Sequence, residues 1–224
     1  MLKALIFDVD GTICETEEIH RAAFNRAFAE TGLNLFWTVE DYRRLLRTTG
    51  GKERMRRHRQ DRGLAQPDDE AIVRLHLLKT QYYVAALARG GIAPRPGVRE
   101  LVSAARQNGL ALAIATTTSP ANVEGLVQAI WGQPAHQVFD VIAAGDEVAA
   151  KKPAPDVYLL ALHRLGLPPD AANALEDSRN GLDSARAAGL RVVVTPSTYT
   201  ATEDFSGADA VVASLADWKQ TFDW

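Results

Sequence analysis

Two carboxylates stand close together at the end of an apolar segment near the N-terminus of this chain. The segment Ala4–Phe7 leads directly into Asp8, and Asp10 follows after Val9 in the sequence KALIFDVDGT. Negative charges this close repel each other, and each raises the pKa of the other. A bound cation would offset that repulsion, and Mg²⁺ favours carboxylate oxygens. The pair predicts a metal site, although a DxD sequence by itself often marks only a capped turn.

Further polar side chains follow the later apolar segments of the chain. They are Thr116, Lys152, Glu176 and Asp177. Because the carboxyl ends of parallel strands meet at one edge of a sheet, we expect these groups to lie near Asp8 and Asp10. Carboxylates can hold Mg²⁺ or attack phosphorus, while a hydroxyl and an ammonium group can hold phosphoryl oxygens. The pattern therefore predicts phosphoryl transfer.

Short apolar segments predict the strands that position these groups. They are residues 2–8, 110–117, 139–146, 173–178, 191–196 and 209–214. Helical patterns lie between them at 96–109, 153–166 and 180–189. Strands that alternate with helices predict right-handed βαβ units. We therefore expect an α/β fold with a doubly wound, mostly parallel, Rossmann-like sheet.

One long stretch, residues 15–91, interrupts this alternation because it contains no strand-like segment. Helical spacing is found at 16–32, 38–51 and 67–87. Thr38 is a good N-cap for the second of these helices. Three or four helices inserted after the first strand predict a helical cap. We expect a core domain of residues 1–14 and 92–224 and a cap domain of residues 15–91.

Composition argues against several classes of protein. The net charge of −3 over 224 residues gives no overall attraction to nucleic acid. Residues 41–62 hold nine Lys or Arg against three acidic residues, but such a run is usually a solvated helix face. No apolar run reaches the ~18 residues that a membrane span needs, and the N-terminal segment lacks a signal-peptide cleavage site. The single Cys14 cannot form an internal disulfide, so we expect a cytoplasmic protein. We also expect a monomer.

The ordered strand-end groups resemble the four motifs of the haloacid dehalogenase superfamily of phosphotransferases. DVDGT is similar to the first motif, Thr116 to the second, Lys152 before Pro153 to the third and EDS to the fourth. The resemblance covers the whole chain, with the helical insert at the position of the family's C1 cap. It implies that Asp8 is the nucleophile and Asp10 the general acid and base. Thr116 and Lys152 would hold the transferring phosphoryl group.

The same resemblance implies a Mg²⁺ site. Its ligands would be Asp8, the backbone carbonyl of Asp10 and Asp177, with Glu176 in contact directly or through water. Dehalogenase and phosphonatase relatives lack an aspartate at the position of Asp10. Its presence favours chemistry in which a leaving alcohol is protonated and water is then activated.

Within the superfamily, the chain is most similar to the beta-phosphoglucomutase-like subgroup, and there to xylulose-1,5-bisphosphate phosphatases of the CbbY type. The segments ETEEIHRAAFN, TTGGKER, LHLLKT, IATTTSPANVE and AAGDEVAAKKPAPD carry this resemblance. In TTGGKER, two glycines expose backbone N–H groups beside Lys52 and Arg54, which is typical of an anion-binding loop. The resemblance implies a small phosphorylated sugar as substrate, bound by Glu17, His20, Gly50, Gly51, Lys52, Glu53, Arg54, His76, Lys79, Thr117, Thr118, Ser119 and Asn122. For His20 and His76, a purely structural role stays open.

These observations favour a Mg²⁺-dependent phosphatase acting on a sugar bisphosphate through an aspartyl-phosphate. A sugar-phosphate mutase of the beta-phosphoglucomutase type, or a phosphatase for another small phosphoester, would carry the same motifs. A signalling receiver shares the acid, hydroxyl and lysine but is only about one small domain long and has no helical insert. Nucleic-acid binding through residues 41–62 is disfavoured by the acidic remainder of the chain.

Overall fold

A buried strand, β1, lies at the centre of the sheet in the computed structural model, which describes residues 1–219. All four of its residues are buried, as expected for a central strand of a parallel sheet. The strands are β1 (Ala4–Phe7), β2 (Ala111–Thr116), β3 (Val141–Ala144), β4 (Ala172–Glu176), β5 (Arg191–Val194) and β6 (Ala210–Val211). Their order is β3-β2-β1-β4-β5-β6, and every pair is parallel. The predicted strands and the doubly wound parallel sheet are confirmed.

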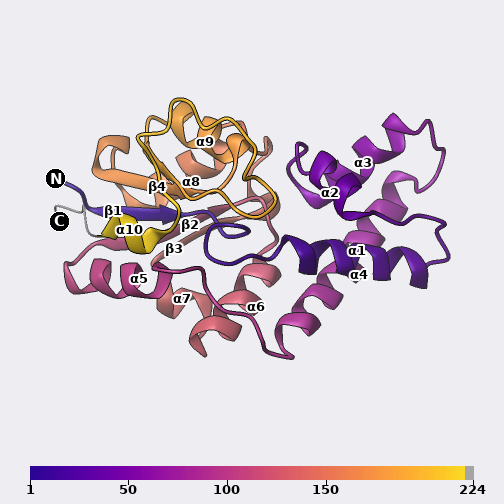
Figure 1. The fold of residues 1–224 in the computed structure, drawn as a ribbon, viewed down its shortest axis with the longest axis horizontal. Coiled ribbons are helices and arrows are strands. Elements are labelled where there is room, and N and C mark those ends of the chain that lie inside the picture. Colours follow the sequence, from indigo (N-terminus) through magenta and orange to yellow (C-terminus); the bar gives the residue numbers. More distant parts are fainter. Residues whose placement is uncertain (220–224) are drawn as a thin grey trace.

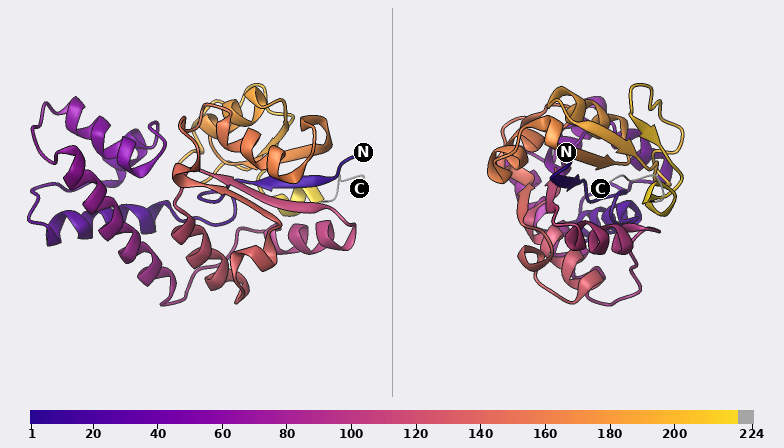
Figure 2. Two further views of the ribbon diagram at one scale, coloured as in Figure 1. Left: turned by 180° about the vertical axis from the view of Figure 1, so that it is seen from behind. Right: turned by 90° about the vertical axis from the view of Figure 1, so that its left-hand side faces the viewer.

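Helices cover both faces of the sheet (Figures 1 and 2). They are α5 (Val98–Gln107), α6 (Pro120–Trp131), α7 (Ala135–Val138), α8 (Asp156–Leu165), α9 (Arg179–Ala187) and α10 (Leu215–Lys219). Leu5 and Phe7 of β1 pack in one apolar cluster with α5, α6 and α7. Ala4 and Ile6 face the opposite way and pack against α8 and α9. The two-residue period of a strand thus builds two cores from one short apolar run.

Four helices are inserted between β1 and α5, and we call them the cap helices. They are α1 (Glu17–Glu30), α2 (Val39–Leu45), α3 (Gly51–Asp61) and α4 (Asp69–Leu87). Figure 1 shows them as one group beside the sheet. Their own apolar cluster includes Phe24, Phe28, Trp37 and Tyr42. The inserted helical cap is thereby confirmed, whereas the domain boundaries stay a prediction, and residues 220–224 lie outside the described residues.

The sequence indicated some cap helices more clearly than others. Thr38 caps α2 as predicted: its hydroxyl accepts a hydrogen bond from Asp41 N at 3.1 Å, and the Asp41 carboxylate accepts from Thr38 N. Helix α3 was not predicted separately, because its sequence GKERMRRHRQD contains one apolar residue, Met55. The helix instead buries Arg54, Met55 and His58 as its inner face. Most other basic side chains of this region are at least partly exposed, as expected for a solvated face.

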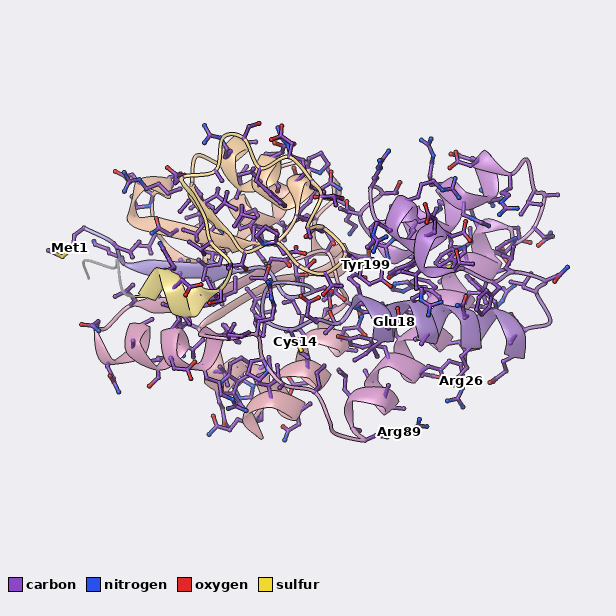
Figure 3. All side chains as sticks on the ribbon, in the orientation of Figure 1. Met1, Cys14, Glu18, Arg26, Arg89 and Tyr199 are labelled. Carbon is purple, nitrogen blue, oxygen red and sulfur yellow. The ribbon has the colours of Figure 1, made fainter. Side chains whose placement is uncertain are left out.

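The cap helices contact the core at the sheet edge. Tyr199, in the segment after β5, donates a hydrogen bond to Glu18 of α1 at 2.6 Å, and both lie at the junction in Figure 3. Cys14 lies in the connection between β1 and α1, where its buried thiol donates to the carbonyl of Ala93. Among residues 1–219, no helix is both long and apolar enough to cross a membrane.

Candidate active site

The predicted catalytic groups meet at the carboxyl edge of the sheet. Asp8 directly follows β1, and Thr116 and Glu176 are the last residues of β2 and β4. Lys152, from the segment between β3 and α8, donates to Asp8 Oδ1 at 2.7 Å and to Glu176 Oε1 at 2.6 Å. The rule that parallel strand ends converge therefore predicted this arrangement correctly.

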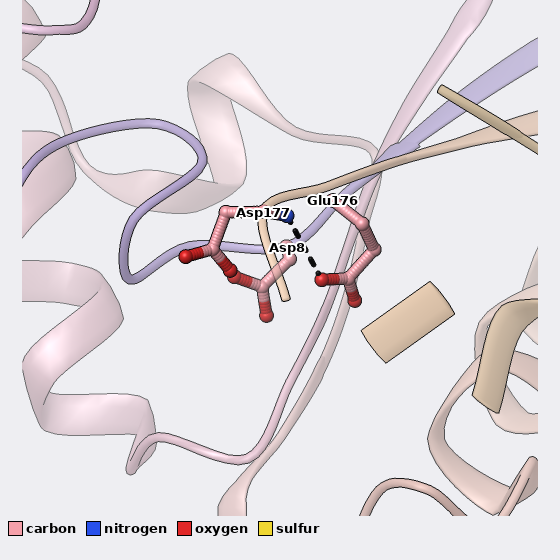
Figure 4. Close-up of side chains that lie close together, drawn as sticks. All are labelled: Asp8, Glu176 and Asp177. Atoms are coloured by element: carbon pink, nitrogen blue, oxygen red, sulfur yellow. Dashed lines mark hydrogen bonds between the residues drawn. The ribbon is translucent and has the colours of Figure 1, made fainter. Parts of the chain in front are cut away.

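Three buried carboxylates form an acidic cluster beside Lys152. Asp8, Glu176 and Asp177 each offer a carboxylate oxygen, and these oxygens all lie within 4.8 Å of one another (Figure 4). Burial raises the pKa of Asp8 to about 8, with Glu176 and Asp10 adding to the effect and Lys152 opposing it. Burial, Asp8 and Glu176 raise the pKa of Asp177 well above its usual range. With all three carboxylates ionised, the cluster would hold more negative charge than one lysine neutralises, and the raised pKa values of Asp8 and Asp177 reflect this.

A divalent cation fits this donor set. Oxygen ligands from carboxylates are those that Mg²⁺ prefers, and its charge would restore the ionised forms of Asp8 and Asp177. Glu176 is less available, because its Oε1 also accepts from Tyr158 at 2.6 Å and its Oε2 accepts from Asp177 N at 3.2 Å. The geometry thus gives Glu176 the task of holding Lys152 and leaves Asp8 and Asp177 as the freer carboxylates.

Asp10 contacts residues at the start of the cap helices. Its Oδ1 accepts from the Thr16 hydroxyl at 2.6 Å and contacts His20 Nε2 at 2.9 Å. Burial opposes ionisation, but the contacts with His20 and Thr16 and the charge of Lys79 hold the pKa of Asp10 well below its usual range. Asp10 is therefore ionised in the free protein, unlike the carboxyl groups of Asp8 and Asp177, whose pKa values are raised.

A buried chain of polar groups continues from Asp10 into α4. Lys79 Nζ lies 2.6 Å from His20 Nδ1, and the His20 ring stacks on Tyr83 with centroids 4.0 Å apart. When Lys79 is protonated its ammonium group can only donate, so Nδ1 then accepts and Nε2 carries the proton that His20 donates to Asp10. Burial and the neighbouring charge of Lys79 lower the pKa of His20, which is consistent with this neutral form.

A cavity of about 90 Å³ lies between the core and the cap helices at this edge. The predicted site residues that line it are Asp8, Asp10, Glu17, His20, Gly50, Gly51, Arg54, His76, Lys79, Thr116, Thr117, Thr118, Lys152 and Asp177. Gly50 and Gly51 could not carry a larger side chain, each for a different reason. Gly50 has φ of 85°, and a Cβ on Gly51 would come within 2.7 Å of the His76 ring. Core and cap thus both contribute to one site.

Five predicted site residues lie outside the lining of this cavity. Lys52, Glu53 and Ser119 line an adjoining cavity of about 240 Å³. Lys52 forms an ion pair with Asp146, which lies in a 3₁₀ turn after β3, so its ammonium group already has an anionic partner. Asn122 is buried beneath the cavity wall, where it donates to the Thr118 hydroxyl at 2.8 Å. The fifth residue, Glu176, lies behind Lys152.

Arg54 is the basic residue of α3 that lines the cavity. It is 8% exposed and donates through Nη1 to Tyr42 at 2.8 Å, and the Tyr42 hydroxyl donates to Glu17 at 2.9 Å. Its buried Nε has no hydrogen-bond partner among the described residues. A buried guanidinium N–H without an acceptor is costly, so this atom is suited to an anionic ligand.

Sequence reasoning missed part of the cavity wall. The additional lining residues are Phe24, Leu46, Thr49, Ser178, Asn180, Thr200 and Glu203. Thr49 lies in the TTGGKER segment, but an argument from glycines and charges gives no reason to choose its hydroxyl. Ser178 and Asn180 follow the EDS motif closely enough that proximity could have suggested them. Thr200 and Glu203 lie in an irregular segment after β5, for which the sequence carries no periodic signal.

Comparison with known proteins identifies the family. The family model for haloacid dehalogenase-like hydrolases matches residues 2–189. The protein CbbY of Rhodobacter capsulatus is 61% identical over 215 residues, which cover 96% of this chain and 94% of that relative. A crystal structure of CbbY from Rhodobacter sphaeroides in complex with phosphate has a TM-score of 0.93 at 52% identity, covering 97% of this chain and 96% of that chain.

A second crystal structure is of a variant of CbbY from Rhodobacter sphaeroides in complex with xylulose-1,5-bisphosphate. It has the same TM-score of 0.93 at 52% identity, and the match covers 97% of this chain and 96% of that chain. The resemblance found from the sequence motifs is thereby confirmed. The chain belongs to the haloacid dehalogenase-like hydrolase family and is a phosphatase.

Proposed function

We propose that this phosphatase requires Mg²⁺ and acts on a sugar bisphosphate, with xylulose-1,5-bisphosphate as the preferred substrate and xylulose 5-phosphate and phosphate as products. The observation that carries this proposal is Arg54, whose buried Nε has no hydrogen-bond partner among the described residues and which lines the same cavity as Asp8, the proposed nucleophile. One phosphate would sit at the core groups and the other at Arg54. The relative crystallised with xylulose-1,5-bisphosphate supports this substrate.

Asp8 and Asp177 are the side chains that would hold Mg²⁺, with the backbone carbonyl of Asp10 as a third ligand. When bound, the ion would neutralise negative charge on the phosphoryl oxygens and on the carboxylates. Lys152 Nζ, fixed by Glu176, keeps one Asp8 oxygen oriented at 2.7 Å. The other Asp8 oxygen is then the nucleophile.

In the first step, the Asp8 oxygen attacks phosphorus, and the bond from phosphorus to the sugar oxygen breaks. Thr116 and Lys152 hold the phosphoryl oxygens, and Asp10 gives a proton to the leaving alkoxide. Asp10 is ionised in the free protein, so it must take up that proton when substrate binds. The negative charge of the incoming phosphate favours this uptake, because like charges raise the pKa of a carboxyl group.

In the second step, Asp10 removes a proton from water, whose oxygen attacks phosphorus and releases inorganic phosphate from Asp8. The low pKa of Asp10 returns the group to its ionised form afterwards. The hydrogen bonds from Thr16 and His20 keep the carboxylate in place throughout. Because His20 belongs to α1, the acid–base group is held by a cap helix.

A phosphate-release screen across sugar monophosphates and bisphosphates tests this function. With Mg²⁺ present, we expect the highest kcat/KM for xylulose-1,5-bisphosphate, and we expect a chelator to abolish turnover until Mg²⁺ is restored. Equal kcat/KM for matched mono- and bisphosphates would reject the bisphosphate assignment. Undiminished turnover in chelator would reject the metal requirement.

A further inference from the structure

A short linker between two cap helices contacts two of the core segments at or next to catalytic groups. Residues 46–50 connect α2 to α3 and lead directly into the Gly50–Gly51 pair. The Thr49 hydroxyl donates to the backbone carbonyl of Lys152. The side chain of Asn180 donates to the backbone carbonyl of Arg47 at 3.2 Å.

Each contact reaches a segment that carries chemistry. Lys152 holds Asp8 and Glu176 through its side chain, so a bond to its backbone carbonyl restrains the group that orients the nucleophile. Asn180 is the second residue of α9, and it follows Glu176 and Asp177 closely along the chain. The linker is thus bonded to the lysine loop and to the start of the helix behind the acidic cluster.

The linker also fixes the anion-binding side of the cavity. Leu46, Thr49 and Gly50 line the cavity themselves. Arg54 N donates to the carbonyl of Gly50 at 3.0 Å, so the helix that carries the unpartnered guanidinium begins where the linker ends. The linker therefore connects the core contacts of Thr49 and Asn180 to the helix that carries Arg54.

We propose that Thr49 and Asn180 are positioning residues of the phosphatase reaction: by docking linker 46–50 on the core, they align Lys152 and the acidic cluster with the cap. Neither hydroxyl nor amide takes part in bond making. Their loss leaves every catalytic side chain present but less well oriented. This proposal rests on the phosphatase activity and not on the identity of the sugar.

The chain offers a matched control for Thr49. Thr48 is the neighbouring residue, is half-buried like Thr49, and within residues 1–219 its side chain makes no hydrogen bond and lines no part of the catalytic cavity. Thr49→Val and Thr48→Val therefore make the same chemical change with and without loss of the docking bond. Thr49→Ser keeps the hydroxyl and serves as the rescue variant.

The test measures kcat and KM for p-nitrophenyl phosphate and for xylulose-1,5-bisphosphate, at a temperature where all variants are folded. Loss of one neutral hydrogen bond corresponds to about 2- to 12-fold in rate. We expect Thr49→Val to lower kcat by this factor for both substrates, Thr49→Ser to recover it, and Thr48→Val to match the parent. Asn180→Ala should also lower kcat, and Thr49→Val with Asn180→Ala should show a non-additive loss because both act on one linker.

Several results would overturn the proposal. Equal kcat for Thr49→Val and Thr48→Val would show that the docking bond has no effect on the chemistry. A change confined to KM for the bisphosphate would make Thr49 a substrate contact, and failure of Thr49→Ser to recover activity would exclude the hydroxyl. If xylulose-1,5-bisphosphate proves not to be a substrate, the proposed function fails, while the p-nitrophenyl phosphate comparison still decides this proposal.

Discussion

Lys152 lies between two carboxylates, and its surroundings show how charge organises the site. Burial opposes its positive charge, but Asp8 and Glu176 raise the pKa of Lys152 above its usual range, so the ammonium is permanent. One permanent cation among three buried carboxylates leaves negative charge that the proposed Mg²⁺ would neutralise. The two carboxylates at the start of the chain thus have different partners: Asp8 belongs to the acidic cluster, and Asp10 contacts His20.

We expect Asp10→Asn to lower kcat for a sugar phosphate by on the order of 10²- to 10⁴-fold, the usual contribution of general acid–base catalysis. The amide keeps an acceptor oxygen for Thr16 and His20, so the local structure should persist. The loss should be smaller for p-nitrophenyl phosphate, whose leaving group needs less protonation. Steady-state kinetics on both substrates would contradict the assignment if the two losses were equal.

Lys79 gives a prediction about stability and pH. Burial, with the charge of Arg54, lowers its pKa from 10.5 to about 7, while Asp10 and Glu17 act in the opposite direction. Between these pH values the unfolded chain binds more protons than the folded chain, so the free energy of unfolding rises with pH by up to about 1.4 kcal/mol per unit. The contribution of Lys79 to the free energy of unfolding is fully present above pH 10.5, the pKa in the unfolded chain, and it is lost as the pH falls toward 7.

The variant Lys79→Met lacks this titration. We therefore expect the parent to gain stability relative to Lys79→Met between pH 7 and about 10, measured by urea unfolding at each pH. Other groups titrate in both proteins and cancel in the difference. Parallel stability curves for the two proteins would show that Lys79 is not held with a lowered pKa.

The elements of the core were predictable because each follows a local rule. The strands are short apolar runs, helix α5 lies between Pro96 and Gly109, and the strand ends place Asp8, Thr116 and Asp177 at one edge. Helix α3 was harder to predict from the sequence, because it buries Arg54 at a position where the helical pattern of apolar residues would require an apolar side chain. The contacts of His20 and Thr49 depend on how the cap meets the core, which no local pattern encodes.

The two basic residues of the TTGGKER segment should now differ in effect. Arg54 lines the cavity, and its Nε has no hydrogen-bond partner within residues 1–219, whereas Lys52 is paired with Asp146 outside the cavity. We expect Arg54→Gln to lower kcat/KM for the bisphosphate by roughly 10- to 100-fold, the value of a charge-assisted hydrogen bond, and Lys52→Gln to lower it far less.

Hydrolysis of p-nitrophenyl phosphate, which has no second phosphate, is the control for both variants. We expect the ratio of the two kcat/KM values to fall in Arg54→Gln and to stay near the parental value in Lys52→Gln. A constant ratio in Arg54→Gln would remove the main physical support for a bisphosphate substrate.

In the whole molecule, the candidate active site needs both the carboxyl edge of the sheet and the cap helices, because residues of both line the cavity. In the mechanism proposed above, the core supplies the nucleophile Asp8, the lysine and the carboxylates that would hold Mg²⁺, while the cap supplies His20, Lys79 and Arg54 to the same cavity. Asp10, the proposed acid–base group, belongs to the core and forms hydrogen bonds with Thr16 and with His20 of the cap helix α1. The molecule can therefore restrict phosphoryl transfer to states in which cap and core are in contact.

The most direct test of this account is a rapid-quench experiment with xylulose-1,5-bisphosphate labelled with ³²P in the phosphate at C1, in the presence of Mg²⁺. We predict that the label appears first on Asp8 and then as inorganic phosphate, leaving xylulose 5-phosphate. Label on another residue, label that returns to the sugar without phosphate release, or normal turnover by Asp8→Asn would contradict the account.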